Sequence, residues 1–325
     1  MAEIALGRLP QSKPKRRSFL TWLVGADSDF QKKDALLGYL FALPWLLGLL
    51  VFIGGPMLYS FYLSFTEHSI VDTPTFVGLE NYRRALFEDE LFYTSLARTF
   101  YFAIIVVPTA LIGSLLLAIL LNQNLRGRTF YRTIFFIPHL TPEVAMAVIW
   151  LWLMHPQLGP FNAALKSIGL PGFEWLSSRA TVVPSLAFIA FWAGVGGNRM
   201  LIFLAGLQSV PTELYEAADM DGAGGMRKFW HITLPMISPT MLFNLVLGII
   251  GALKVFNLAW VATNGGPAYG SWFFALHVFE NAFEFYRLGY GSALAWIFAV
   301  ILIIFTLVQL WTSNRWVYYA GEERE

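Results

Sequence analysis

Long apolar runs alternate with shorter polar segments along most of the chain. Six of these runs are long enough to cross the roughly 30 Å hydrocarbon core of a bilayer as helices. Only a helix satisfies every backbone N–H and C=O group within lipid at this length, so the pattern predicts an all-α membrane protein with six transmembrane helices. The expected spans are 35–62, 100–121, 134–154, 182–207, 239–262 and 288–311.

The composition supports this fold class and excludes several kinds of site. Of the 325 residues, 57% are hydrophobic and 13% are charged, whereas a soluble domain is about half apolar and about a quarter charged. The chain has no cysteine, which excludes disulfides and thiolate ligands, and no residue cluster indicates a metal site. A net charge of +1 gives no field that would attract a nucleic acid. The expected surroundings are the lipid bilayer.

Lysine and arginine are unevenly divided between the two sets of segments that flank the spans. The N-terminal tail, 122–133, 208–237 and the C-terminal tail together carry 14 of them, and the opposite segments carry 6. Because cytoplasmic loops are enriched in these residues, we expect both termini in the cytoplasm and the spans in the plasma membrane. The expected organisation is a basic cytoplasmic tail at 1–34, a transmembrane domain at 35–315 and a second tail at 316–325.

The polar segment 209–239 lies between the fourth and fifth expected spans. Thr212 follows a proline and indicates the start of a short helix. Gly222, Gly224 and Gly225 allow positive φ and a sharp reversal of the chain. A second short helix, ended by the Leu-Pro of "ITLPMISP", leads into the fifth span. The apolar face of this segment suits docking to a soluble partner, and the alternative is a folded loop that only caps the helix bundle.

This segment resembles the EAA motif of the membrane subunits of binding-protein-dependent ABC importers. The motif reads E-A-A, three residues, G, nine residues, I, any residue, L-P. The matching positions are Glu216, Ala217, Ala218, Gly222, Ile232, Leu234 and Pro235. "VGLENYRRAL" at 77–86, "FLAGLQSVPTELYEAADMDGA" at 203–223 and "NGGP" at 264–267 resemble the carbohydrate branch, similar to the maltose and glycerol-phosphate permease subunits. The resemblance covers about 35–315.

The resemblance implies that 209–239 is a coupling loop whose helices sit in a cleft of a cytoplasmic ATPase dimer. Glu216 would bond to the ATPase and Gly222 would allow the turn between the two short helices. Glu213 and Asp219 lie on the first of these helices and are included in the expected contact. The chain has no phosphate-binding motif of the form G-x-x-x-x-G-K-S/T. We therefore expect a transport subunit rather than an enzyme, with no cofactor of its own and with ATP and Mg bound by partner subunits.

Two further partners follow from the same resemblance. A second six-helix permease subunit would form the other half of the pathway. An extracytoplasmic solute-binding protein would deliver the solute, and the segments 63–99, 155–180 and 263–287 would face it.

Polar residues within the spans indicate a path for the solute. An ionisable side chain inside the membrane is expected to face a cavity or a partner. Glycines interrupt the fourth span just before Asn198 and Arg199, although they could equally serve close helix packing. In the fifth span Lys254 and Asn257 lie three residues apart and would share a helix face. The substrate-path candidates are Asn198, Arg199, Lys254, Phe256, Asn257 and Trp260.

Lys254 also has a purely structural interpretation, in which it pairs with a carboxylate such as Glu143. His139 and Glu143 lie in "IPHLTPEV", which indicates a helix kink between two prolines. We expect a structural or gating role for this pair, and a proton relay is the alternative.

The leading hypothesis is the permease subunit of an ATP-driven importer for a sugar or oligosaccharide. The same class of importer could carry a glycerol-phosphate-like anion, because Arg199 and Lys254 could bind one. A proton-coupled secondary transporter that uses His139, Glu143 and Lys254 is a different class, and it usually shows an inverted repeat that this chain lacks. A membrane scaffold is a third class.

Overall fold

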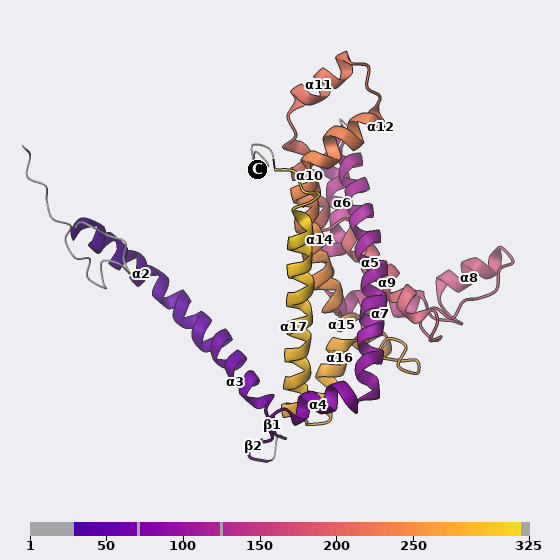
Figure 1. The fold of residues 1–325 in the computed structure, drawn as a ribbon. Helices are drawn as coiled ribbons and strands as arrows, with labels where there is room; N and C mark the ends of the chain where they lie inside the picture. The colour runs from indigo at the N-terminus through magenta and orange to yellow at the C-terminus, as the bar shows by residue number, and fades with distance from the viewer. Residues whose placement is uncertain (1–28, 70–71, 124–125, 320–325) are drawn as a thin grey trace, which may run out of the picture. The chain divides into compact units, whose positions relative to one another are not determined.

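The computed structural model describes residues 29–69, 72–123 and 126–319, and its secondary structure is almost entirely helical (Figure 1). The chain divides into two units, 1–60 and 61–325. Most of the expected N-terminal tail and the last residues of the C-terminal tail lie outside the described residues.

The first unit is built around one long apolar helix. It contains α2 (Asp29–Leu49), the π-helical turn η1 (Leu50–Gly54) and the start of α3 (Gly55–Leu63), which continues into the second unit. Together these form a candidate span at Asp34–Leu63, with no buried residue in its most apolar window. An apolar helix with this much exposed surface is suited to contact with lipid or with another span.

The long helix α5 (Glu90–Asn122) is the centre of the second unit. Its buried side chains form a hydrophobic core with Leu186, Phe273 and Phe274. A second core, towards the end of α5, gathers Leu121, Phe203 and Ile237. The helices packed against α5 are α9 (Val182–Val195), α10 (Asn198–Gln208), α14 (Ser238–Leu253) and α16 (Phe274–Phe279).

Shorter elements connect and extend these helices. The strands β1 (Thr66–Glu67) and β2 (Thr75–Phe76) pair antiparallel beside the last long helix, α17 (Leu288–Ser313). The remaining elements are α4 (Glu80–Phe87), α6 (Arg128–Leu140), α7 (Glu143–Leu153), α8 (Pro160–Ser167), α11 (Thr212–Met220), α12 (Gly225–Lys228), η2 (Phe229–Thr233), α13 (Leu234–Met236), α15 (Asn257–Thr263) and η3 (Glu280–Glu284).

The described residues hold four helices long and apolar enough to span a membrane, or six if each of two bent helix pairs is counted as one span. The expected third span, 134–154, is one of these pairs: α6 and α7 meet at 92°. The break lies at Pro142, whose ring prevents the preceding residue from continuing the helix. The expected fourth span, 182–207, is bent by 47° between α9 and α10. Neither expected span is a single straight helix.

One other expected boundary, the start of the second span, was wrong. The second span begins at Glu90 rather than at residue 100, because the Asp89 side chain accepts a hydrogen bond from the backbone N–H of Leu91 and caps the helix there. The fifth span is one candidate span, Ser238–Thr263, close to the expected bounds 239–262, but it is not one unbroken helix. It leaves the helix after Leu253 and begins again at Asn257.

Candidate functional site

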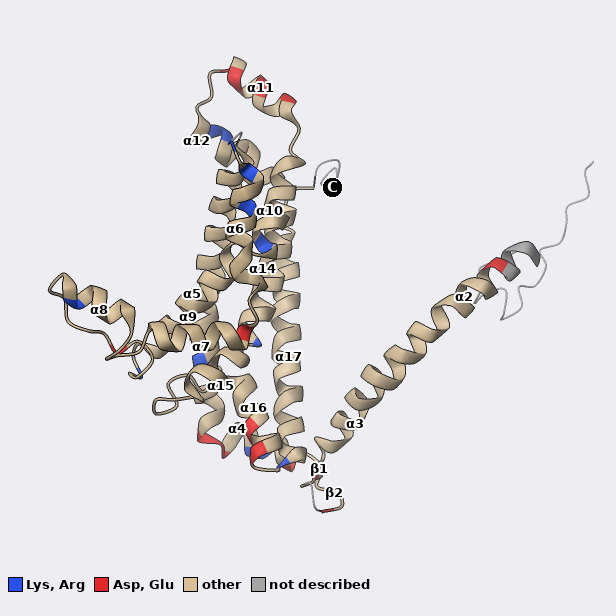
Figure 2. Ribbon diagram, turned by 180° about the vertical axis from the view of Figure 1, so that it is seen from behind, with Lys and Arg blue, Asp and Glu red and all other residues tan. Residues whose placement is uncertain are grey.

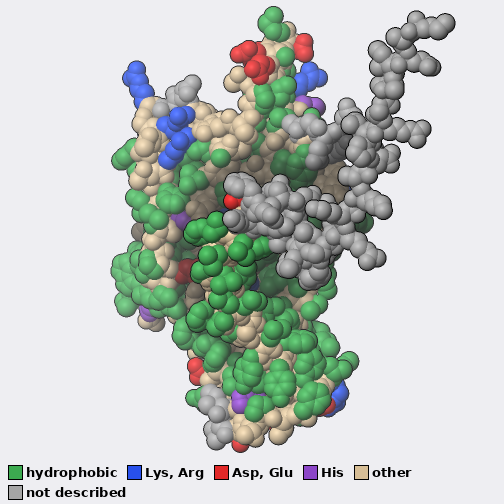
Figure 3. Space-filling model, turned by 90° about the vertical axis from the view of Figure 1, so that its left-hand side faces the viewer, with side chains coloured by type: hydrophobic (Ala, Val, Ile, Leu, Met, Phe, Trp, Pro, Cys, Tyr) green, Lys and Arg blue, Asp and Glu red, His purple; other side chains and the backbone are tan. Residues whose placement is uncertain are grey.

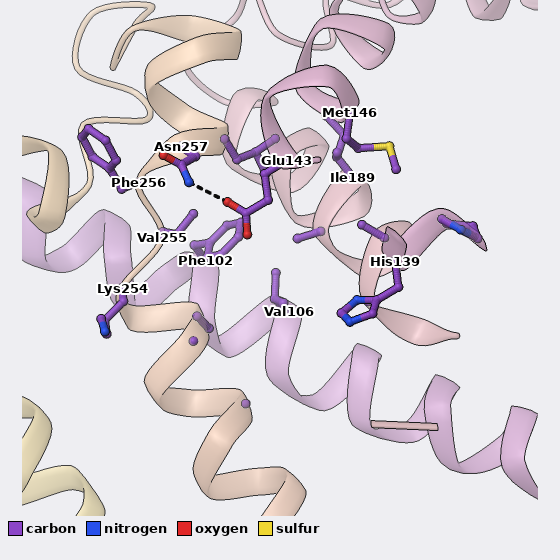
Figure 4. A pocket seen from close by; sticks show the side chains of 18 of the residues that line it. Phe102, Val106, His139, Glu143, Met146, Ile189, Lys254, Val255, Phe256 and Asn257 are labelled. Atoms are coloured by element: carbon purple, nitrogen blue, oxygen red, sulfur yellow. Dashed lines mark hydrogen bonds between the residues drawn. The ribbon is translucent and has the colours of Figure 1, made fainter. Parts of the chain in front are cut away.

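A cavity of about 480 Å³ lies among α5, α6, α7, α9, α10, α14 and α15 (Figure 4). Most of its wall is apolar, and includes Phe102, Val106 and Ile189. The polar side chains that line it are His139, Glu143, Arg199, Lys254 and Asn257, with Phe256 beside them. The structure therefore gathers four of the six substrate-path candidates and both gating candidates around one space.

Glu143 and Asn257 are joined directly across this cavity. The Asn257 side-chain N–H donates to Glu143 Oε2 over 2.8 Å, the bond drawn in Figure 4. Each residue is the first of its helix, α7 or α15, and the two helices pack together. Helix N-termini favour negative charge, which suits the Glu143 carboxylate.

The suggested pairing of Lys254 with Glu143 is wrong. Glu143 bonds to Asn257, and among the described residues Lys254 has no ion pair. Figure 4 shows Lys254 and His139 on opposite sides of Glu143 in this view. Lys254 and Asn257 also do not share a helix face, because Lys254 ends α14 and Asn257 begins α15.

Arg199 reaches the cavity from the first turn of α10. Its side chain is half-buried, and a Cβ added at Gly248 would lie 3.3 Å from Nη2 of Arg199. A Cβ at Gly194 would lie 4.0 Å from Nη1. The guanidinium thus lies between α14 and α9, where glycines leave it space. Among the described residues it has no ion pair.

The glycines at the bend of the fourth span serve close packing. A Cβ at Gly196 would collide with the backbone carbonyl of Phe135, and one at Gly197 would lie 2.6 Å from the His139 ring. These glycines let α6 approach the bend and so place His139 at the cavity wall. The packing interpretation of the glycines is supported, and the bend also presents Arg199 to the cavity.

Two substrate-path candidates lie away from the cavity lining. Asn198 is exposed and is not part of the wall. Trp260 stacks on Phe256 with ring centroids 5.6 Å apart, and both rings contact Phe279. Trp260 thus packs against Phe256, which lines the cavity, but does not line the cavity itself.

The coupling segment projects from the second unit at the end where α11 and α12 lie (Figure 1). Acidic side chains lie on α11 and basic ones on α12 (Figure 2), and charged groups gather at this tip (Figure 3). Glu213, Glu216 and Ala217 are exposed, and Ala218 is half-buried. Met220 is 90% exposed. The helix α11 has no fully buried residue, and most of its side chains are exposed in this chain.

Only one of the three glycines in this segment adopts a left-handed conformation. Gly222 has φ +69°, directly after α11. Gly224 instead precedes α12 with extended backbone, and Gly225 is its first residue. The reversal therefore depends on Gly222, where a side chain would be strained.

The second half of the motif has an internal structural role. Ile232 packs against the second core, and the Tyr215 hydroxyl lies 2.9 Å from the Thr233 hydroxyl, which ties α11 to η2. The sequence predicted that the Leu-Pro pair ends the second short helix. In the structure Leu234 and Pro235 are instead the first residues of α13, so the pair begins a helical turn.

Asp219 is engaged within the same segment. Its carboxylate pairs with the Lys228 ammonium over 2.6 Å and links α11 to α12. This contact was not anticipated, because the partners lie on either side of the glycine reversal.

Sequence reasoning missed a polar network at the opposite end of α5. Asp89 Oδ2 accepts hydrogen bonds from His277 Nε2 at 2.8 Å and from the Tyr290 hydroxyl at 2.5 Å. The indole N–H of Trp272 donates to His277 Nδ1, which leaves Nε2 as the ring atom that donates to Asp89. Burial raises the pKa of Asp89, but the hydrogen bonds from His277, Tyr290 and the Leu91 backbone outweigh it and lower the pKa to about 2.

No sequence pattern identified this network, because its members come from segments almost 200 positions apart. It joins the start of α5 to α16 and α17, and gives the segment 263–287 a helix and buried side chains where only a turn cluster was expected.

Comparison with known proteins gives consistent matches. A sequence model of the family described as "Binding-protein-dependent transport system inner membrane component" matches residues 92–317. The probable ABC transporter permease protein YesP of Bacillus subtilis is 36% identical over 296 residues, covering 90% of this chain and 95% of that protein. A trehalose/maltose transport system permease protein of Thermococcus litoralis is 34% identical, covering 87% and 95%.

Further matches extend the comparison. An arabinooligosaccharides transport system permease protein of Bacillus subtilis is 33% identical, covering 89% of this chain and 91% of that protein. The fold matches the crystal structure of a bacterial ABC transporter involved in the import of the acidic polysaccharide alginate. That match has a TM-score of 0.77 and 24% identity, and covers 87% of this chain and 96% of that chain.

Proposed function

The chain belongs to the family of inner membrane components of binding-protein-dependent transport systems, and from that premise we propose that it moves a sugar or oligosaccharide into the cytoplasm. It is a multi-pass membrane protein and the permease subunit of an ABC importer, a transport component without catalytic activity. Because the chain belongs to this family, the proton-coupled transporter and the membrane scaffold are set aside as hypotheses.

The proposed cargo is supported by the relatives and by the cavity. The printed names of relatives include transport of trehalose or maltose and of arabinooligosaccharides. The cavity offers the Asn257 amide, the Glu143 carboxylate and the Phe256 ring. Amides and carboxylates bind hydroxyl groups, and aromatic rings pack against the apolar faces of sugar rings.

Within this pathway we assign Arg199, Lys254, Asn257 and Phe256 to solute contact. His139 and Glu143 lie at the α6–α7 bend, so movement of either helix would change the cavity, and we assign them a gating role. Asn198 and Trp260 act indirectly. Asn198 is the first residue of α10 and directly precedes Arg199, and Trp260 stacks on Phe256.

The exposed face of α11 is the observation that carries the coupling role. Glu216, Ala217 and the apolar Leu214 are all exposed on α11. Such a surface suits a partner's groove. We propose that this partner is a cytoplasmic ATPase dimer that binds ATP and Mg, and that 209–239 transmits its closure to the spans.

The full complex then contains three further components. These are a second six-helix permease subunit, the ATPase dimer and an extracytoplasmic binding protein that meets 63–99, 155–180 and 263–287. The distribution of Lys and Arg supports cytoplasmic termini. The proposed domains are those of the sequence: tails at 1–34 and 316–325, and a permease domain at 35–315.

Reconstitution tests the proposal. Proteoliposomes that hold this chain with its co-purified permease and ATPase partners should accumulate labelled oligosaccharide when ATP is inside and loaded binding protein outside. Vesicles with this chain alone should accumulate none, with or without a pH gradient. Uptake driven by a pH gradient in the absence of ATP would contradict the proposal.

A glycerol-phosphate-like anion is the second candidate cargo. Arg199 and Lys254, which both line the cavity, favour it. Uptake of labelled glycerol phosphate and not of any sugar would select this alternative.

A further inference from the structure

The cavity carries more positive than negative charge. Arg199 and Lys254 both line it, and Glu143 is the one carboxylate among the described residues of its wall. Two cations and one carboxylate leave a formal charge of +1 at neutral pH. One oxygen of Glu143 is also occupied by the Asn257 amide, which reduces its capacity to neutralise either cation.

Of the two cations, Arg199 has the greater need of an opposite charge. Its guanidinium is held between Gly248 and Gly194 at a bend in a span, and no described carboxylate lies within ion-pair distance. A cation removed from bulk water in a membrane protein is costly unless an opposite charge accompanies it. The other polar groups of the wall do not supply that charge.

We propose that the transported sugar bears a carboxylate, and that Arg199 is the residue that selects for it. This inference rests on the proposed function and specifies its substrate class. A guanidinium presents two parallel N–H donors whose spacing matches a carboxylate. The adjacent glycines keep this side chain accessible from the cavity, because a methyl group at Gly248 would approach Nη2 to 3.3 Å.

The charge of the wall favours a singly charged anion. A carboxylate bears one negative charge and balances the net +1. A phosphate monoester bears −1.5 to −2 at neutral pH and would exceed it. A neutral sugar would leave Arg199 uncompensated. Lys254, at the end of α14, adds longer-range attraction as a point charge.

The experiment compares matched sugars on the complete complex. Disaccharides that carry a single uronic-acid unit are each offered beside their carboxyl-reduced neutral counterparts, with glycerol phosphate as a separate anion. Uptake and sugar-stimulated ATP hydrolysis are measured in proteoliposomes with the loaded binding protein. We expect at least one uronate to be taken up about tenfold faster than its neutral counterpart, as one lost charge-assisted bond would give.

Variants assign the selection to one side chain. Arg199→Gln should raise the KM for the uronate about tenfold more than it raises the KM for the neutral sugar. Arg199→Lys, which keeps the charge and loses the two-pronged geometry, should lie between them. Arg126→Gln removes an exposed cation from the segment between α5 and α6 and should behave as the unmodified complex.

The outcomes separate the inference from the proposed function. Equal or faster uptake of neutral sugars overturns the carboxylate inference and leaves the sugar importer intact. Uptake of glycerol phosphate alone, or of none of these probes, overturns both. If Arg199→Gln lowers the yield of assembled complex, or impairs both sugars equally, then the guanidinium pairs with a partner subunit and the inference is wrong.

Discussion

The coupling segment and the cavity are built in opposite ways. The coupling segment, 209–239, is contiguous in sequence, mostly exposed, and linked internally by Asp219–Lys228 and Tyr215–Thr233. The cavity draws side chains from seven helices, and its polar residues lie where those helices bend or end. A surface that binds a partner can be formed by one short stretch of the sequence, whereas a cavity between helices is formed by residues far apart in the chain.

This difference predicts how each region responds to substitution. Changes on the exposed face of the coupling segment should alter transport without altering stability. Changes at the helix breaks around the cavity should alter both, because the same residues pack the bundle and shape the space.

The largest effect is expected at Glu216. Glu216→Lys reverses a charge on the exposed surface of α11 and should lower ATP-driven uptake by about 100-fold or more. The reason is that two like charges placed together in an interface cost several kcal/mol of binding free energy. Thermal stability and membrane insertion should stay unchanged. Uptake in proteoliposomes and co-purification of the ATPase are the measurements.

Asp221→Lys is the matched control, because it makes the same charge change just beyond α11 at an exposed position where the motif allows any residue. Equal loss in both variants would mean that the overall charge of the segment, and not the Glu216 contact, drives coupling.

The next largest effect concerns the bend beside the cavity. Gly196→Ala drives a methyl group into the carbonyl of Phe135 and should destabilise the bundle by about 1–3 kcal/mol or more. The thermal unfolding midpoint of the purified complex measures this. Gly251→Ala lies on the same cavity with no atom within 4 Å of the added methyl and should leave the midpoint unchanged. If both substitutions are harmless, the close approach of α6 is not required.

A third prediction uses the network at the start of α5. The pKa of Asp89 is about 2 in the folded chain and about 3.9 unfolded. Its charge therefore stabilises the fold above pH 4, and this contribution is lost as the pH falls towards 2. Asp89→Asn keeps a helix-capping side chain but should cost about 1–2 kcal/mol at pH 7, allowing for solvent screening of a partly exposed group.

Unfolding midpoints of both proteins between pH 8 and pH 3 test the Asp89 prediction. The gap between them should be constant down to about pH 5 and narrow below pH 4. A gap that does not change with pH would mean that packing, and not the charge, is lost in the variant.

The smallest effect is expected at Asp219. Its exposed pair with Lys228 should contribute less than about 1 kcal/mol, and salt should screen it. Asp219→Asn should therefore lower uptake less than about fivefold, and less still at high ionic strength. A loss as large as that of Glu216→Lys would show that Asp219 binds the ATPase rather than holding its own loop together.

Much of the architecture was predictable because apolar runs of span length have few structural solutions in lipid. The Thr212 helix start was confirmed. The positions and angles of the helix breaks were harder to predict from the sequence. Pro142 suggested a kink, but no sequence signal gave its 92° angle or the interruption after Leu253.

The sequence by itself determined the membrane class, the motif 216–235 and the family, since each depends on composition or on residues a few positions apart. The tertiary structure alone decided that Glu143 bonds to Asn257 rather than to Lys254, that Arg199 enters the cavity beside Gly248, and that Asp89 meets His277 and Tyr290. These contacts join distant segments, and which partner a polar group finds depends on how the helices bend and pack, a property that the order of residues does not display.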